Sequence, residues 1–359
     1  MTTGAPPLRA KIVKLHRWLG LAAAAFWLLQ AITGTMIVFH WEIRDAAISD
    51  LHRPTDPAGI ERRLNRFAPP GTKAAVDSMW TTAGLPDRYD VFFTDAAGAN
   101  RSARIAGDGT ILRGPDEPSG GILDIAVGLH HNLLAGTTGD WIVGVTGLLL
   151  VSNLIAGSMA AWPRNAPWKS VVRPINRGPS AARLFSWHRA IGLWLVVPAL
   201  VLAVTGTLLK FPDGVANLAG ADTPSMPPVP AHGAPVGVGR AIETAFATLP
   251  GSMLVSVGFP TAQDATYTIG LQTPQEMRRA YGASRVLVDA NDGRVRGSFP
   301  IVKASFATRA FNALVPIHTG RVAGLGGRLL IFAIGIWLIA MIITGLLLWH
   351  RRRKKRTFA

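Results

Sequence analysis

Four long apolar stretches dominate the pattern of hydrophobic and polar positions along the chain. They cover roughly residues 18–39, 141–161, 190–209 and 329–349, and none contains a charged residue. A helix of about 20 residues crosses a hydrocarbon core of about 30 Å. The pattern therefore predicts four membrane-spanning helices rather than the buried core helices of a soluble protein.

These stretches belong to an internal repeat. Seven positions recur at an offset of 172: His16, Gly20, Leu21, Thr33, Gly34, Thr35 and Phe39 correspond to His188, Gly192, Leu193, Thr205, Gly206, Thr207 and Phe211. Five more recur at an offset of 188: His130, Gly136, Gly139, Gly147 and Gly157 correspond to His318, Gly324, Gly327, Gly335 and Gly345. Shared offsets over this many positions indicate two halves, each made of a helix, a long insert, a His-Gly segment and a helix.

The two inserts are polar and have similar patterns. Helices are predicted at Pro54–Phe67 and Val238–Leu249, and strands at Tyr89–Thr94, Arg101–Ala106, Ile111–Leu112, Met253–Val257, Ala265–Leu271 and Arg285–Asp289. Hairpin turns are predicted at 107–109 and 291–293. A metal-binding loop at Asp108-Gly109 or Asp292-Gly293 is the alternative, but the preference of Asp and Gly for tight turns explains both pairs better. Each insert is expected to form a small α+β module.

The expected fold class is a membrane all-α four-helix bundle, built as two pseudo-repeats of two transmembrane helices, with two small α+β modules. The expected segments are transmembrane helix 1 (14–41), module 1 (42–121), the His segment with helix 2 (122–162), a basic cytoplasmic loop (163–187), helix 3 (188–211), module 2 (212–316), the His segment with helix 4 (317–350) and a basic cytoplasmic tail (351–359). Pro198 predicts a kink in helix 3.

Basic residues gather in three segments that contain no acidic residue. Segments 1–17, 163–189 and 351–359 hold four, six and six of them, which equals the formal net charge of +16. Segments rich in Lys and Arg remain on the cytoplasmic side of a membrane. We therefore expect a multi-pass membrane protein with both termini cytoplasmic and both inserts outside, in the periplasm if the cell is Gram-negative. The positive charge points to the lipid bilayer as a partner, not to nucleic acid.

Histidines are the chain's candidates for binding a redox centre. There is no cysteine, which excludes thiolate-bound iron–sulfur clusters and covalently attached c-type haem. Seven of the nine histidines lie at the ends of the apolar stretches, where ionisable side chains are functional candidates. If the halves pack about an axis along the membrane normal, His16 faces His188 and His130 faces His318. This gives one bis-histidine site on each side of the membrane.

A planar macrocycle with a central iron is the natural occupant of a site between two imidazoles. Arg17 and Arg189 directly follow the cytoplasmic pair and are candidates for neutralising haem propionates. In the simplest alternative, the histidines are interfacial anchors that bind nothing. A zinc site is a further alternative, but no carboxylate or third histidine is placed in the repeat with either pair.

Two other histidines compete for these roles. His350 ends the fourth apolar stretch and competes with His16 and His188 on the inner side. His40 competes with His130 on the outer side, although its repeat mate is a proline. His130 also precedes its apolar stretch by about ten residues, so the chain must fold it back toward the membrane.

The motif His-Arg-x-x-Gly-Leu with a distal Thr-Gly, followed by Leu-His and then Gly-x-x-Gly, resembles the PepSY-associated transmembrane family, also called iron-regulated membrane proteins. The likeness covers nearly the whole chain and both repeats. Family members that resemble this chain include siderophore reductases with two b-type haems. The resemblance implies a protein of the bacterial inner membrane whose two inserts are PepSY-like periplasmic modules. It also implies two haem b, with His16, His188, His130 and His318 as axial ligands of the haem iron.

We therefore expect an inner-membrane b-type di-haem electron-transfer protein that reduces a ferric siderophore from Fe3+ to Fe2+ on the periplasmic side. Its electrons would come from a quinol or a cytoplasmic reductase. No catalytic side chain is expected, because one-electron reduction needs no group transfer. The alternatives are a non-redox, membrane-anchored PepSY protein that binds a siderophore, peptide or peptidase, and a transport accessory protein.

Overall fold

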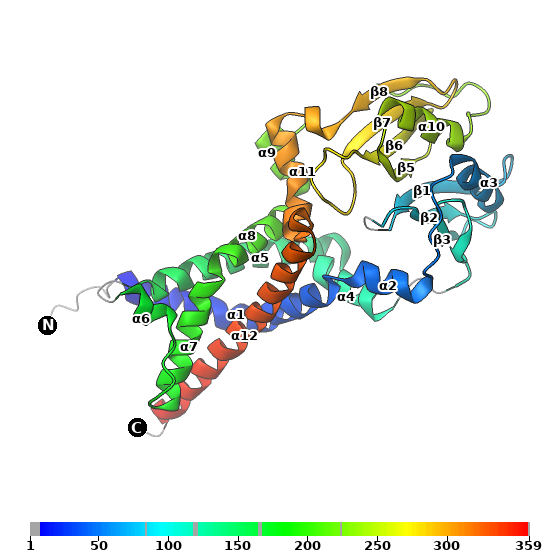
Figure 1. Ribbon diagram of the computed structural model, residues 1–359. Helices are drawn as coiled ribbons and strands as arrows, with labels where there is room; N and C mark the ends of the chain where they lie inside the picture. The colour runs from blue at the N-terminus through cyan, green and yellow to red at the C-terminus, as the bar shows by residue number, and fades with distance from the viewer. Residues whose placement is uncertain (1–7, 83–84, 118–120, 164–166, 223–224, 358–359) are drawn as a thin grey trace. The chain divides into compact units, whose positions relative to one another are not determined.

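The computed structural model describes residues 8–82, 85–117, 121–163, 167–222 and 225–357 of the chain. The chain divides into two compact units (Figure 1): a helical unit of residues 1–38, 121–213 and 317–359, and a sheet unit of residues 39–120 and 214–316. Arg164 of the basic loop and residues 358–359 of the basic tail lie outside the described residues.

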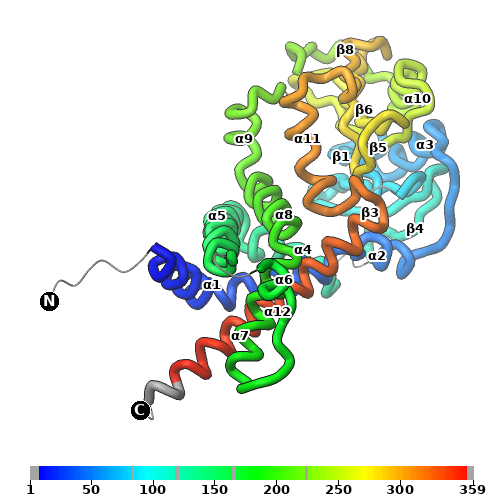
Figure 2. Tube along the Cα trace, turned by 60° about the vertical axis from the view of Figure 1, so that its left-hand side comes forward, coloured from blue at the N-terminus to red at the C-terminus, as the bar shows by residue number. Residues whose placement is uncertain are grey.

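The helical unit is built around three long helices. Its elements are α1 (Leu8–Ile37), α4 (Ile122–Asn132), α5 (Gly136–Ala161), α6 (Trp168–Val172), α7 (Ser180–Trp194), α8 (Val196–Leu208), a 3-10 turn (Arg321–Ala323) and α12 (Gly324–Thr357). Helix α1 packs against α4, α5 and α12, α5 packs against α8, and α7 packs against α12 (Figures 1 and 2). Helices α9 (Pro212–Ala219) and α11 (Phe306–His318) carry the chain between the two units.

Among the described residues, three segments are long and apolar enough to cross a membrane: Leu8–Ile37, Gly136–Ala161 and Arg321–Arg353. The pair α7 and α8 is bent by 63° and counts as a fourth span only if both helices are taken together. Pro198 explains the bend, because its ring collides with the carbonyl group of Trp194, four residues earlier. Leu195 accordingly leaves the helical region, with φ −118° and ψ 13°. The single helix expected at 188–211 is therefore two helices.

The strands of both inserts join in one antiparallel sheet of the sheet unit. They are β1 (Ala75–Thr81), β2 (Arg88–Thr94), β3 (Asn100–Ala106), β4 (Ile111–Arg113), β5 (Met253–Gly258), β6 (Thr266–Gln272), β7 (Ser284–Asp289) and β8 (Val295–Phe299). Their order is β4-β3-β2-β1-β5-β6-β7-β8. The two inserts meet where β1 pairs with β5, with Met79 opposite Val257. Each insert therefore supplies half of the sheet.

A single hydrophobic core lies under this sheet. Helices α3 (Pro57–Phe67) and α10 (Val238–Thr248) pack against each other and against the sheet. The core contains Ile60 and Ile242 from these helices together with Met79 and Val257 from the central strands, all fully buried. Helix α2 (His40–Ile48) and a 3-10 turn (Ile301–Lys303) complete the unit. The two inserts therefore fold as one body.

The expected four-helix bundle with two small modules is therefore wrong. The described residues form twelve α-helices and one eight-stranded antiparallel sheet, with only three continuous candidate spans. Two separate modules would each expose β1 or β5 as a sheet edge, with unpaired N–H and C=O groups. Pairing the two strands removes both edges and merges the modules.

Two histidine pairs in the helical unit

Four histidines of the helical unit form two pairs. The ring centres of His16 on α1 and His188 on α7 lie 6.4 Å apart, with their planes at 50°. Those of His130 on α4 and His318 on α11 lie 6.5 Å apart, with their planes at 29°. Each pair thus brings together equivalent positions of the two repeat halves.

Sharp chain reversals bring the second pair into the helical unit. After α4 the chain turns into α5, where Gly139 packs so closely on the carbonyl oxygen of Asn132 that a Cβ atom would overlap it. In the second half, Gly327 of α12 packs in the same way on Gly320. The Gly-x-x-Gly segments of the sequence therefore allow the chain to turn closely after His130 and after His318.

Each of the four imidazoles faces a glycine on a neighbouring helix. A Cβ atom would lie 2.8 Å from Cε1 of His16 if placed on Gly157, 2.7 Å from Cε1 of His130 on Gly34, 2.6 Å from Cε1 of His318 on Gly206, and 3.5 Å from Cε1 of His188 on Gly345. The first three distances are shorter than a real Cβ contact allows. These glycines therefore make room for the imidazole rings.

The Nδ1 atom of every paired histidine has a hydrogen-bond acceptor. It lies 3.1 Å from the carbonyl oxygen of Asn153 for His16, of Gln30 for His130 and of Leu202 for His318, and 2.8 Å from the hydroxyl oxygen of Thr344 for His188. The Thr344 hydroxyl donates its own hydrogen to the carbonyl of Ala340 at 2.7 Å, so it accepts from His188. All four Nδ1 atoms therefore carry the ring hydrogen, and each Nε2 keeps its lone pair.

This arrangement fits a metal ion bound between the two rings of each pair. Within the described part of the chain, none of the four Nε2 atoms takes part in a hydrogen bond. Take a metal–nitrogen bond of about 2.0 Å and a nitrogen about 1.1 Å from the centre of its ring. Two imidazoles that bind one metal from opposite sides then have ring centres about 6.2 Å apart. The observed separations of 6.4 and 6.5 Å agree with this value.

The number of ligands fits haem iron better than a protein-bound zinc ion. The described residues contain no group of three or more His, Cys, Asp or Glu side chains that surrounds a common point. Each pair thus offers two nitrogens, which is the number of axial positions on a porphyrin-bound iron. A structural zinc site needs four protein ligands.

The histidines of the second pair are neutral in their surroundings. His130 and His318 lie on α4 and α11, outside the candidate spans. Burial lowers the pKa of His130 to about 3, and the neighbouring His318 adds to this effect. Burial likewise lowers the pKa of His318 to about 4. A neutral imidazole is the form that binds a metal.

The other residues expected at the inner site have different partners among the described residues. His350 is exposed near the end of α12. Among the described residues, its ring does not pack on the ring of His16 or His188. Arg17 is exposed, with its guanidinium 5.7 Å from the ring centre of Trp18. Arg189 donates through Nε to the last carbonyl of α5 at 3.0 Å. His40, the alternative on the outer side, belongs to the sheet unit, and its ring centre lies 4.5 Å from that of Trp41 with the planes tilted by 36°.

Three threonines contact the paired histidines and were not expected to do so. The hydroxyls of Thr33 and Thr205 lie 3.4 and 3.3 Å from Nδ1 of His130 and His318, and Thr344 contacts His188. The Thr-Gly pair repeated at 33–34 and 205–206 was the signal for the first two. Thr344 had no such signal, since its repeat mate is Ala156.

Comparison with known proteins places this arrangement in a family. The family model described as the PepSY-associated TM region matches residues 13–352, which include both histidine pairs and both inserts. No curated protein matches the chain. Because the family match extends over nearly the whole sequence, it covers the helical unit and the sheet unit together. The chain therefore belongs to the PepSY-associated transmembrane family and is a membrane protein of that type.

Proposed function

We propose that the protein is a b-type di-haem electron-transfer protein of the bacterial inner membrane that reduces ferric siderophores on the periplasmic side. One observation carries the proposal: two histidine pairs at ring separations of 6.4 and 6.5 Å. In each pair the Nδ1 atoms have acceptors, which leaves the Nε2 atoms to bind iron. His16 and His188 would hold one haem, and His130 and His318 the other.

The chain's own residues orient the ligands. Backbone carbonyls accept from Nδ1 of His16, His130 and His318, which fixes the tautomer and makes Nε2 a stronger donor to a metal. The Thr344 hydroxyl has this role for His188. Bound haem iron would supply a one-electron carrier at each pair.

The spacing of the pairs supports one site near each face of the membrane. His16 and Gly34, the glycine that faces His130, lie on the same helix α1. Their separation of 18 sequence positions corresponds to about 27 Å along the helix axis. This is close to the thickness of a hydrocarbon core, about 30 Å.

The charge distribution supports the proposed direction of electron flow. The basic segments 1–17 and 163–189 flank His16 and His188 in the sequence, so the positive-inside rule puts this pair on the cytoplasmic side. A quinol or a cytoplasmic reductase would donate electrons there. The pair of His130 and His318 would then serve the periplasmic side, with both inserts periplasmic and both termini cytoplasmic.

Iron chemistry explains why reduction would release the metal. Siderophores bind iron through hard oxygen ligands, which hold Fe3+ far better than the softer Fe2+. Transfer of one electron to the ferric chelate therefore weakens the complex without breaking a covalent bond. The protein needs to supply the electron and a surface for the chelate.

The decisive experiment is an absorption spectrum of the purified full-length protein in detergent. Reduction with dithionite should produce a b-type α-band and a Soret shift, with about two haems per chain. His16→Ala and His130→Ala should each lose one haem, whereas the matched controls His350→Ala and His131→Ala should keep both. A protein that stays colourless after haem is supplied would overturn the proposal.

A second measurement tests the substrate separately. The reduced protein is mixed with a ferric siderophore under anaerobic conditions, and a ferrous-specific chelator traps the product. Haem reoxidation should match the Fe2+ formed, one electron for each iron. If the haem-loaded protein is not reoxidised, the haem assignment still holds, but the ferric siderophore is excluded as the substrate.

A further inference from the structure

A partly buried ion pair lies at the junction of α8 and α5 in the helical unit. The ammonium group of Lys210, two residues after the end of α8, donates to a carboxylate oxygen of Asp140 on α5 at 2.6 Å. It also donates to the carbonyl oxygen of His131 at 2.7 Å. The side chain of Lys210 is 16% exposed and that of Asp140 is 41% exposed. Two short hydrogen bonds therefore fix the lysine, and its charge is the less solvated of the two.

The stem of Lys210 is held in place as well. Helix α8 packs along α5. A Cβ atom placed on Gly144 of α5 would lie 3.2 Å from Cβ of Lys210 and still closer to the ring of the next residue, Phe211. This close approach leaves the lysine few other positions, so the ammonium group stays beside the segment that follows His130.

The Lys210 ammonium lies close to both histidines of the outer pair, His130 and His318. His131, whose carbonyl accepts from Lys210, directly follows His130. Lys210 follows Gly206, the glycine that faces the imidazole of His318, by four positions, which is about 6 Å along a helix axis. The positive charge of Lys210 lowers the pKa of His130 and of His318. Its electric field therefore reaches both rings.

The other half of the repeat places a cation at the equivalent junction. Val38 is the repeat mate of Lys210 at the offset of 172, and Arg328 is the repeat mate of Asp140 at the offset of 188. The guanidinium group of Arg328 on α12 donates to the backbone oxygen of Val38, directly after α1, at 2.7 Å. The glycine that faces the imidazole of His130 precedes Val38 by four positions. Each half therefore places a cation about one turn beyond a glycine that faces an imidazole of the outer pair.

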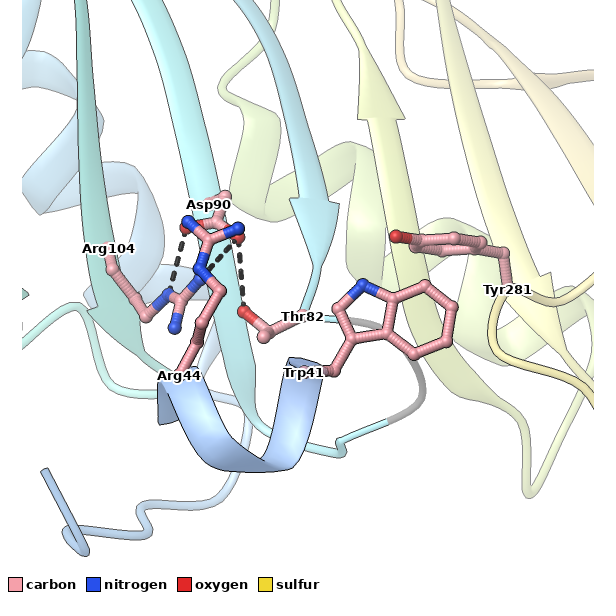
Figure 3. Close-up of a pocket in the computed structure, with 6 residues that line it drawn as sticks. All are labelled: Trp41, Arg44, Thr82, Asp90, Arg104 and Tyr281. Carbon is pink, nitrogen blue, oxygen red and sulfur yellow. Dashed lines mark hydrogen bonds and ion pairs between the residues drawn. The ribbon is translucent and has the colours of Figure 1, made fainter. Parts of the chain in front are cut away.

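An ion pair of the sheet unit shows what a purely structural role looks like. Arg104 donates to Asp90 through two nitrogens at 2.9 Å each, and the Thr82 hydroxyl donates to the same carboxylate at 3.3 Å (Figure 3). Arg104 on β3 and Asp90 on β2 lie directly opposite each other in the sheet. That pair joins neighbouring strands. Lys210 also joins two elements, so a test of any further role must separate charge from packing.

A fixed positive charge near a haem favours its reduced form. Ferric haem carries one positive charge more than ferrous haem, so a nearby cation destabilises the oxidised state and raises the midpoint potential. At an effective dielectric constant of about 20, a unit charge about 10 Å away changes a one-electron equilibrium about tenfold, or about 59 mV. The carboxylate of Asp140 opposes this effect, but water and salt screen an exposed charge more strongly than a buried one.

We propose that Lys210 sets the redox potential of the outer site and that Asp140 positions it. This inference rests on the proposed function, because it concerns the haem that His130 and His318 would hold. The ammonium group acts through space and raises the midpoint potential of that haem. A raised potential draws the electron away from the haem at the other histidine pair and toward the periplasmic side.

A spectroscopic redox titration of the full-length, haem-loaded protein in detergent tests the proposal. The component that is missing in His130→Ala belongs to the outer haem. Lys210→Met should lower the midpoint of this component by about 59 mV, a tenfold change for one electron. Asp140→Asn leaves the ammonium group without its counter-charge and should raise the same midpoint. Loosened packing would shift the midpoint in the same direction in both variants, whereas a charge effect gives opposite signs.

Two controls separate the charge from the side chain. Lys210→Arg keeps the charge and should keep the midpoint. Lys169→Met removes an exposed lysine of α6 by the same substitution and should leave both midpoints unchanged. If Lys210→Met loses the outer haem, the shift in Asp140→Asn decides: a raised midpoint supports the proposal, and an unchanged or lowered one refutes it.

The possible failures are distinguishable. An unchanged outer midpoint in Lys210→Met with both haems bound would refute the role of Lys210 and leave the proposed function in place. A wild-type protein that binds no haem would overturn this inference and the proposed function together.

Discussion

The imidazole of His130 lies directly over Gly34, on a different helix. A Cβ atom at Gly34 would lie 2.7 Å from Cε1 of His130, whereas one at Gly345 would lie 3.5 Å from Cε1 of His188. Gly34→Ala should therefore displace its histidine, because extra volume in a packed contact forces side chains off their positions. Gly345→Ala should be tolerated.

Under the proposed function, haem content measures this difference. Gly34→Ala should lose about half of the haem, at the site of His130 and His318, and Gly345→Ala should keep both haems. Equal haem content in the two variants would mean that the glycine does not control the position of His130.

The hydrogen bond from His188 to Thr344 is the only one of the four Nδ1 contacts that depends entirely on a side chain within the described residues. Thr344→Val should leave Nδ1 without an acceptor and weaken the proposed haem binding at His16 and His188 by about 10–100-fold. Thr33→Val is the control, since His130 keeps the carbonyl of Gln30. A spectroscopic redox titration should show a shifted midpoint in the first variant only.

The carboxylate of Glu61 on α3 accepts from the backbone N–H of Gly239 at 2.9 Å, in the first turn of α10. It thus links the two inserts and stabilises the positive end of a helix dipole. Glu61→Ala should lower the stability of the sheet unit by about 1–2 kcal/mol. The exposed Glu243 on the same helix α10 is the control, and Glu243→Ala should change thermal unfolding little.

The ion pair of Arg88 and Asp45 is buried, with the Arg88 side chain fully inaccessible and a separation of 2.8 Å. Asp45→Asn keeps the shape but leaves the cation unpaired, which should cost about 3 kcal/mol and lower the melting temperature by roughly 6–12 °C. Asp50→Asn, at an exposed position, should have no such effect. A melting temperature that does not change in Asp45→Asn would show that the pair is not stabilising.

Local pattern predicted much of the secondary structure. Six of the eight strands and the helices α3 and α10 lie where alternation and turn residues indicated them. Strands β1 and β8 were not predicted. The position of β1 in the sheet is defined by its partners, because β1 pairs with β2 along one edge and with β5 along the other.

The sequence alone determined the repeat, the apolar segments and the positions of the paired histidines. These follow from spacing and hydropathy, which are properties of short stretches of chain. The sequence also predicted the kink at Pro198, which is a local effect. Only the tertiary structure decided that the two inserts form one sheet and that glycines make room for the imidazoles. Those features depend on contacts between residues far apart in the sequence, such as Met79 with Val257 and Gly34 with His130, and local periodicity carries no information about such partners.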